Sequence, residues 1–411
     1  MAANATIITT PETVSAWVCA YNPIVFTVSS TNTAEANFRY VIDINIDYPI
    51  TVSKRLKMSA RPDGFLLIDI HRIIENYLSF DFGIGEATDA MPCLNSHVDF
   101  VVSFGVEYGT TPVVYPDLGI TSNIYAIPAA LKHSVASYGS EPDYISVDLE
   151  TDYRITNAVT GTTAKFLTSS PRTITMCLGK NYYLYTTYKN EPIKLRVRLY
   201  NTAGTLTATT YKTLTTGIDV VTRIGVGTYN IALFLGTSLT GIGSYDVTLC
   251  NAGNTPLGET FTFIIDCDCT KYNESFRLHW LNPLGGFDAH TFNKRFDRSF
   301  NIKKANYTKI LGAVDVAGAF TFSPSQAGKV LFDSRATESI KINSDWVTEE
   351  YNTWLLTLAK STQVFWEIDN DTYAPVTVTN TSYKQETYAG EKLFNAEFTI
   401  EISNEIISQR Q

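Results

Sequence analysis

The chain has 411 residues, of which 44% are hydrophobic and only 18% are charged, and its net charge is −9. This hydrophobic content excludes a disordered protein, and the length predicts two to four domains. The acidic balance argues against an extended nucleic-acid-binding surface, which requires clustered Lys and Arg, so no direct reading of nucleic acid is expected. Tyrosine (24) and phenylalanine (22) are abundant, and because aromatic residues are enriched in strands and at interfaces, we expect association with other subunits.

The first residues carry no basic, apolar leader, and no stretch approaches the ~20 apolar residues of a membrane span. Six cysteines are scattered along the chain, and only Cys267 and Cys269 are close to each other. One intervening residue is not the usual spacing of a zinc site. We therefore predict a reduced chain that is synthesised in a bacterial cytoplasm.

Residues 1–134 are predicted to form a β-domain with one packed helix. Residues 24–28 form a short apolar run, and apolar residues alternate with polar ones over 38–46, as in a half-buried strand. After a turn at 62–64, Asp69 is placed to cap a helix. Its apolar face has helical spacing and comprises Ile70, Ile73, Ile74, Tyr77 and Leu78.

Residues 135–268 are predicted to form an immunoglobulin-like β-sandwich. Residues 193–199 alternate strictly, the Asn-Thr-Ala-Gly sequence at 201–204 predicts a hairpin turn, and 206–211 return as the second strand. Further strands are predicted over 229–235, 245–249 and 261–265. Their regular spacing is typical of a sandwich.

Residues 269–411 are predicted to form an α+β domain. An aromatic segment with a Pro and a Gly-Gly pair opens it at 276–288, and strands are expected over 299–309, 319–322, 363–368, 375–379 and 398–402. A helix is expected between them, with one apolar face and Glu349, Glu350 and Asn352 facing out. The apolar face comprises Val347, Tyr351, Trp354, Leu355 and Leu358. The fold class is thus mainly β, with sandwich domains followed by an α+β domain.

No catalytic motif is recognisable in the chain. There is no phosphate-binding loop and no nucleophile elbow. His279, Asp288 and His290 have the chemistry of three metal ligands, but two histidines eleven residues apart in an irregular segment are more often packing residues. We expect neither an enzyme nor a bound cofactor or metal.

Three parts of the chain resemble a known family, and their order carries the resemblance. They are an N-terminal part made of residues 21–28, 38–44 and 63–78, the segment FRLHWLNPLGGFDAHTF at 276–292, and the C-terminal unit 346–402. Together they resemble the tail or neck ring-type structural virion proteins of crAss-like and related Bacteroidetes-infecting tailed phages. The resemblance implies a ring around a short tail, below the portal, with the chain itself and other tail, neck and portal proteins as partners. It implies location in the virion.

Rings form when one patch of a subunit meets a different patch on the next copy and the rotation closes. Each such contact is expected to bury more than ~1,000 Å². As interface candidates we take four residues of the aromatic segment and five of the basic stretch that follows. They are Trp280, Leu281, Asn282 and Phe287, and Lys294, Arg295, Arg298, Lys303 and Lys304.

Three other functions remain open from the residues alone. A host-surface or glycan-binding virion adhesin would present Trp17 or Trp366 in a solvent cleft, where a sugar ring stacks. A cell-envelope lipoprotein is disfavoured because Cys19 follows no apolar run. A depolymerase ranks last because the chain lacks repeats of the β-helix type.

Overall fold

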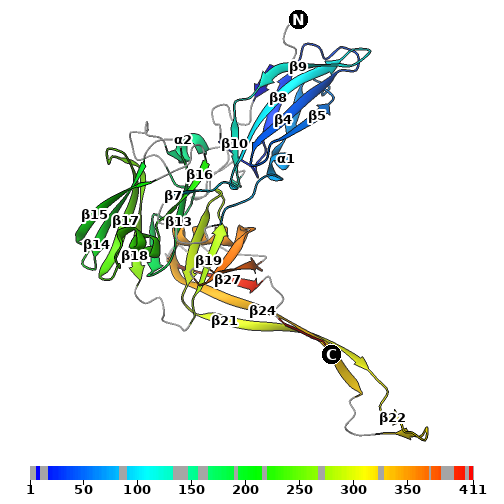
Figure 1. The fold of residues 1–411 in the computed structure, drawn as a ribbon, viewed down its shortest axis with the longest axis vertical. Coiled ribbons are helices and arrows are strands. Elements are labelled where there is room, and N and C mark those ends of the chain that lie inside the picture. Colours follow the sequence, from blue (N-terminus) through cyan, green and yellow to red (C-terminus); the bar gives the residue numbers. More distant parts are fainter. Residues whose placement is uncertain are drawn as a thin grey trace. The chain divides into compact units, whose positions relative to one another are not determined.

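The computed structural model describes residues 6–9, 17–82, 90–132, 147–155, 165–188, 193–214, 220–266, 274–322, 328–369, 372–380, 393–402 and 407–410. The chain divides into two compact units, each held together by contacts among its own residues. Unit 1 comprises residues 1–269 and 280–290, and unit 2 comprises 270–279 and 291–411. The elements of both are drawn in Figure 1.

The N-terminal part of unit 1 has two sheets around one apolar core. The larger sheet has the order β2-β10-β8-β4-β5, with β9 also paired to β8, and the smaller has the order β1-β3-β6. Alternation along β4 buries Tyr40, Ile42, Ile44 and Ile46, as its sequence predicts. The strands are β1 (Thr6–Thr9), β2 (Trp17–Cys19), β3 (Val25–Ser29), β4 (Arg39–Tyr48), β5 (Val52–Met58), β6 (Leu66–Asp69), β8 (Val98–Tyr108), β9 (Val113–Ile120) and β10 (Ile124–Ile127).

The predicted helix of this part is present but short. Helix α1 spans His71–Glu75, and Ile70 and Ile74 are buried in the core beside the sheets. Asp69 is the last residue of β6, and the N-cap position of the helix is Ile70. Asp69 Oδ1 accepts hydrogen bonds from the backbone N–H groups of Ile24 and His71, so it fastens the strand end to the helix start.

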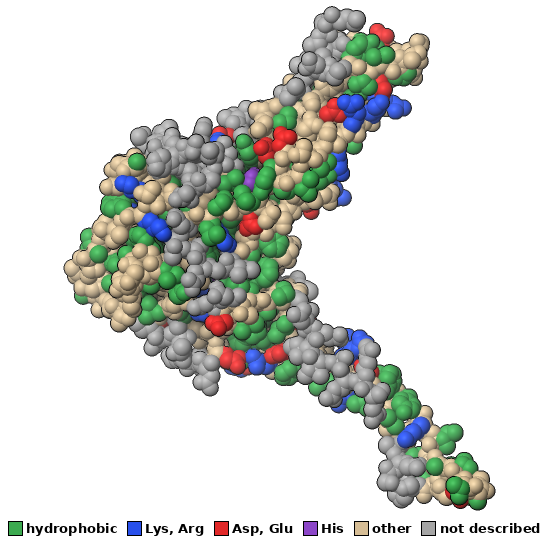
Figure 2. All heavy atoms as spheres, viewed as in Figure 1, with side chains coloured by type: hydrophobic (Ala, Val, Ile, Leu, Met, Phe, Trp, Pro, Cys, Tyr) green, Lys and Arg blue, Asp and Glu red, His purple; other side chains and the backbone are tan. Residues whose placement is uncertain are grey.

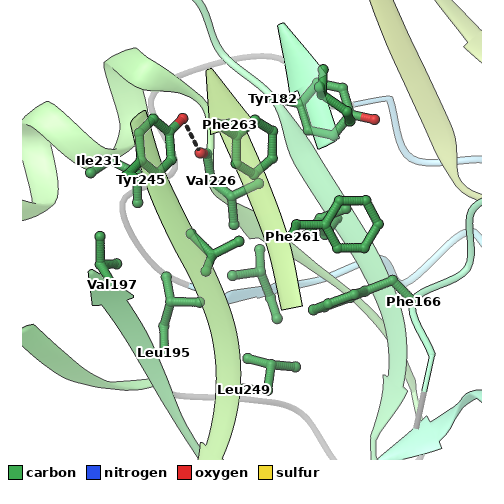
Figure 3. Close-up of a cluster of buried hydrophobic side chains, with 14 of the residues drawn as sticks. Phe166, Tyr182, Leu195, Val197, Val226, Ile231, Tyr245, Leu249, Phe261 and Phe263 are labelled. Atoms are coloured by element: carbon green, nitrogen blue, oxygen red, sulfur yellow. Dashed lines mark hydrogen bonds between the residues drawn. The ribbon is translucent and has the colours of Figure 1, made fainter. Parts of the chain in front are cut away.

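The second part of unit 1 is a sandwich with its own core. One sheet has the order β12-β18-β17-β14-β15 and the other β11-β13-β16-β7. Tyr245 lies in the core and donates a hydrogen bond from Oη to the Val226 carbonyl at 2.8 Å (Figure 3). The elements are β7 (Ala90–Pro92), α2 (Leu149–Tyr153), β11 (Arg154–Ile155), β12 (Thr173–Cys177), β13 (Tyr183–Tyr188), β14 (Ile193–Asn201), β15 (Leu206–Leu214), β16 (Val220–Gly225), β17 (Ile242–Asn251) and β18 (Pro256–Asp266).

The strand predicted over 229–235 is wrong, because Thr228–Leu235 form helix α3. Asn230 accepts a hydrogen bond from the Gly227 N–H at the start of the helix, and Gly236 ends it with a left-handed φ of 64°. A short apolar run is compatible with either a strand or a helix, and here the end signals decide for the helix.

Most of an eight-stranded sheet belongs to unit 2, while the end of β19 (280–281) and the first part of β20 (287–290) are counted with unit 1. The sheet has the order β20-β19-β25-β26-β27-β24-β21, with β28 also paired to β24, and β22 and β23 form a separate ribbon. Helix α4 (Glu349–Lys360) packs on β24 and β27 and buries Trp354, Leu355 and Leu358. The strands are β19 (Phe276–Leu281), β20 (Phe287–Phe292), β21 (Phe296–Thr308), β22 (Ala313–Val314), β23 (Phe320–Thr321), β24 (Lys329–Thr348), β25 (Val364–Asp369), β26 (Thr372–Val378), β27 (Leu393–Ile402) and β28 (Ile407–Arg410).

One detail of the predicted helix is wrong: Asn352, expected on the outer face, is buried. Thr357 is also buried, so the buried face of α4 is wider than its apolar stripe. Glu349 and Glu350 are exposed as expected.

The fold class is confirmed: the molecule is mainly β with several sheets and an α+β unit. The predicted boundaries after 134 and after 268 stay predictions, because residues 133–146 and 267–273 lie outside the described part. No helix among the described residues is long and apolar enough to cross a membrane.

The expectation of a wholly reduced chain is wrong at one position. Cys177, the last residue of β12, is disulfide-bonded. Cys19, Cys93 and Cys250 are free and buried. Cys267 and Cys269 lie outside the described residues.

Candidate assembly arm

The aromatic segment expected to form an interface is interior. Trp280 is fully buried, and Leu281, Asn282 and Phe287 are also covered by the chain itself. Phe287 packs against Phe80 and Phe82, with ring centroids 5.6 and 5.1 Å apart. Side chains that their own chain already covers have no surface left for a second subunit, so these four residues are corrected from interface candidates to core residues.

A buried hydrogen-bond network holds the turn in this segment. The Asn282 Nδ2 donates to the Leu167 carbonyl at 2.9 Å and to Asp288 Oδ1 at 3.0 Å, while its Oδ1 accepts from the backbone N–H groups of Leu284 and Gly286. Thr168 Oγ1 donates to the same Asp288 oxygen at 2.6 Å. The side chains of Asn282 and Asp288 thus stabilise the turn through hydrogen bonds within the chain.

Two of the three suspected metal ligands, His279 and Asp288, have separate structural partners. His279 Nε2 lies 2.8 Å from Glu367 Oε2, and the Arg277 Nε lies 3.0 Å from the same oxygen, all within the interior of unit 2. Asp288 belongs to the Asn282 network described above. Within the described part of the chain, no three His, Cys, Asp or Glu side chains form a group able to hold a metal.

The basic stretch lies on and before β21, and its members differ in surroundings. Lys294 is half-buried, and Arg295 makes a loose, exposed pair with Asp297 at 3.4 Å. Arg298 pairs with Glu274 at 2.9 Å and with Glu338 at 2.7 Å. Lys303 and Lys304 are exposed and have no ion pair among the described residues. These last two remain interface candidates.

Lys303 and Lys304 belong to a β-ribbon that leaves the sheet of unit 2 (Figure 1). We call residues 299–337 the arm: they comprise the outer parts of β21 and β24, which pair from Phe296–Ile342 to Thr308–Lys329, and the terminal β22–β23 ribbon. Only β28 pairs with the arm from the side, at positions 333–336. Apart from that stretch, no layer covers the two-stranded ribbon among the described residues.

The arm exposes large apolar side chains along its whole length. Eleven of them are each at least two-fifths exposed, and Ile310 is 83% exposed. Figure 2 shows green, hydrophobic side chains gathered over the described part of the arm, with a few blue ones among them. The eleven are Phe300, Ile302, Tyr307, Ile310, Leu311, Val314, Val316, Phe320, Phe322, Leu331 and Phe332. At ~100 Å² each, they leave on the order of 1,000 Å² of apolar surface, which matches one side of a stable protein interface.

The two faces of the arm differ near its base. Directly opposed residues of an antiparallel pair lie on the same face. Ile302 is opposite Ala336, and Phe300, two residues earlier, shares that face with Lys304. Lys303, opposite Arg335, lies on the other face. One face therefore combines Phe300 and Ile302 with Lys304, and at its base Glu338, opposite Phe300, is paired with Arg298. The other face is polar.

The arm is basic in an acidic protein. It carries two acidic side chains, Asp315 and Asp333, against five basic ones, while the chain as a whole has a net charge of −9. The basic residues are Lys303, Lys304, Lys309, Lys329 and Arg335. Opposite charge on the rest of the chain favours contact between the arm and the body of another copy.

Neither tryptophan suggested for glycan binding lies in a solvent cleft. Trp17 is fully buried, with its ring stacked on Tyr125 at 4.9 Å. Trp366 is half-buried against Phe276 at 5.2 Å. Both are packing residues, so the feature that would favour an adhesin is not found at these positions.

No protein-family model and no curated protein matches the chain. Among solved structures it is similar to a tetra-tandem repeat in the extending region of a large adhesion protein, at 10% identity, with 98% of this chain and 91% of that one covered and a TM-score of 0.19. It is also similar to the full extracellular region of plexin A4, at 8% identity and a TM-score of 0.15; 64% of this chain is covered, and it spans about a quarter (24%) of that chain's length. At such TM-scores neither likeness bears on function.

Proposed function

We propose that the chain is a structural subunit of a tailed-bacteriophage particle, which forms a homo-oligomeric ring around the tail or neck, below the portal. The observation that carries the proposal is the arm. About 1,000 Å² of apolar surface on a two-stranded ribbon is unfavourable in water, and among the described residues no other part of the chain covers it. When subunits assemble, this apolar surface is buried against a second copy of the chain and is no longer exposed to water.

The choice of a virion among possible assemblies rests on the resemblance of residues 21–28, 38–44, 63–78, 276–292 and 346–402 to phage ring-type proteins. Two further features fit a structural role. The polar residues of the most distinctive segment serve internal hydrogen bonds, and those of β19 form a buried ion-pair cluster with Glu367. This leaves the arm as the exposed feature that contacts other subunits.

The proposal is tested by shortening the arm without disturbing the sheet. Thr308 and Lys329 are directly opposite each other, so residues 309–328 can be replaced by a two-residue Asn-Gly hairpin turn. This removes six of the eleven exposed apolar side chains. We expect the wild-type chain to form closed oligomers of one size in mass photometry and negative-stain microscopy, and the shortened chain to remain monomeric with an unchanged melting temperature.

A wild-type chain that stays monomeric at every concentration, or a shortened chain that still closes rings, contradicts the role of the arm. Placement in the particle is tested separately. Antibodies against the chain should label the tail or neck of virions, and labelling of the capsid alone contradicts the proposed position.

A further inference from the structure

A second surface of unit 2 matches the arm in chemistry. Trp346, near the end of β24, is 64% exposed and is the only exposed one of the five tryptophans. Glu349 and Glu350, which begin α4, are exposed beside it. We call these three residues the helix-start patch. It offers one large aromatic ring and two carboxylates.

No cation among the described residues pairs with the carboxylates of this patch. Among the described residues, neither Glu349 nor Glu350 makes an ion pair, and the same holds for Lys304 on the arm. Acidic residues in a first helical turn are favoured by the helix dipole, which accounts for the two glutamates in an isolated chain. The dipole does not account for an exposed tryptophan, because a large apolar ring is normally buried.

The arm and the patch cannot meet within one chain. β24 extends from Lys329 to Thr348, and Ser334, opposite Lys304, is twelve residues before Trp346. At ~3.3 Å per residue the two surfaces are on the order of 40 Å apart. β24 is held by β21 on one side and by β28 and β27 on the other, so it cannot fold back on itself.

We propose that the apolar face of the arm, with Phe300, Ile302 and Lys304, docks on the helix-start patch of a second copy of this chain. Phe300 and Ile302 cover the Trp346 ring, and Lys304 pairs with Glu349 and Glu350. The inference rests on the proposed self-assembly and specifies its contact. Because the two surfaces are different, the contact is head-to-tail, which is the arrangement that closes rings. A tryptophan at the centre and charges around it are typical of strong interfaces.

Charge reversal in the full-length chain tests the contact. Lys304→Glu places like charges together, and we expect a roughly 10- to 100-fold weaker association, measured by sedimentation velocity across concentration. Lys303→Glu is the matched control: it makes the same change in net charge one residue away, on the opposite face, and should change the association less than ~3-fold. The double substitution Glu349→Lys with Glu350→Lys should weaken association as Lys304→Glu does.

Rescue distinguishes a direct contact from a general charge effect. A single chain that carries Lys304→Glu together with Glu349→Lys and Glu350→Lys should regain the wild-type oligomer, because each arm again meets opposite charge. Equal effects of Lys303→Glu and Lys304→Glu, or no recovery in the combined variant, overturn the assigned contact while leaving assembly by the arm intact. A wild-type chain that never associates overturns both.

Discussion

Asn282 and Asp288 face each other across the turn between β19 and β20, with Asn282 Nδ2 3.0 Å from Asp288 Oδ1. Both side chains are almost completely buried in unit 1. The same carboxylate oxygen also accepts the Thr168 hydroxyl, so one acidic residue fastens this turn to a segment 120 positions earlier in the chain. The most distinctive sequence of the protein therefore acts in folding.

Replacing Asp288 with Ala should destabilise unit 1 by about 2–3 kcal/mol. The substitution leaves two buried donors, on Asn282 and Thr168, without this acceptor, and unsatisfied buried donors are costly. Urea denaturation measures the change in the free energy of unfolding. The control is Asp297→Ala, which removes only the exposed pair with Arg295 and should cost less than about 0.5 kcal/mol. Equal effects of the two substitutions would mean that the network contributes nothing.

Replacing Glu367 with Gln should destabilise unit 2 by about 3–5 kcal/mol. Glu367 is fully buried and is the anionic partner of both Arg277 and His279, so its neutral form leaves the Arg277 charge uncompensated in the interior. The measurement is thermal and urea unfolding of the full chain. Glu397→Gln breaks a pair of similar length with Lys341 at the surface and should cost at most about 1 kcal/mol. A loss for Glu367→Gln no larger than for this control contradicts the assignment.

Replacing Gly286 with Ala should cost more than an ordinary glycine substitution. A Cβ atom at this position would lie 2.7 Å from the Leu167 carbonyl oxygen and 3.1 Å from Tyr185 Cβ, so the backbone must move. We expect a loss of about 2–3 kcal/mol, typical of an overpacked core. Gly318→Ala is the control: its φ of +82° costs about 1–2 kcal/mol, but nothing lies within 4 Å of the new atom. A smaller loss at Gly286 than at Gly318 would show that the close approach relaxes freely.

Glu259 should make the stability of unit 1 depend on pH. Burial raises the pKa of this carboxyl above its ordinary 4.5, against the opposing effect of Arg172, whose Nε lies 2.6 Å away. The folded state therefore binds the proton more tightly than the unfolded state, and this contribution to stability decreases as pH rises from about 4.5 through the raised pKa. Between about pH 4 and pH 7, the free energy of unfolding of wild type should fall relative to that of Glu259→Gln. A difference that grows with pH would show that the Arg172 pair dominates and lowers the pKa.

The sequence was a good guide where a strand is half-buried and ends in a recognisable turn. β14 alternates strictly, and Asn201 accepts hydrogen bonds from the Ala203 and Thr205 N–H groups in the turn, where Gly204 takes a φ of 78°. Periodicity of two and a turn residue with positive φ are local properties, so they can be read without knowing the neighbours. The same holds for α4, whose apolar face has a period of 3.6.

β24 was not predicted between 322 and the helix, although it is the longest strand of the molecule. Only its C-terminal half packs on a core, where Ile340 and Ile342 are buried. Apolar and polar residues therefore alternate only in that half. The half in the arm is solvated on both faces, so no hydrophobic periodicity marks it. Its conformation comes from thirteen paired positions with β21, which are long-range hydrogen bonds that no local pattern records.

One residue from each group of interface candidates illustrates what the sequence could not decide. Trp280 and Lys304 are both plausible contact residues by type, since aromatic and basic side chains are common at interfaces. The structure places Trp280 in the core, while Lys304 is exposed on an uncovered ribbon. Residue type indicates which contacts a side chain can make with another subunit. Tertiary packing decides whether the side chain is exposed and can make them.

The sequence alone determined the mainly β class, the amphipathic helix α4, the turn at 201–204 and the exposure of the basic residues on β21, because periodicity, turn chemistry and charge act locally. Only the tertiary structure decided that the aromatic segment is buried, that Arg277 and His279 share one carboxylate, and that the paired strand β24 separates the arm from Trp346. Burial and strand pairing join residues far apart in the chain, and the free energy that fixes such contacts belongs to the packed core as a whole.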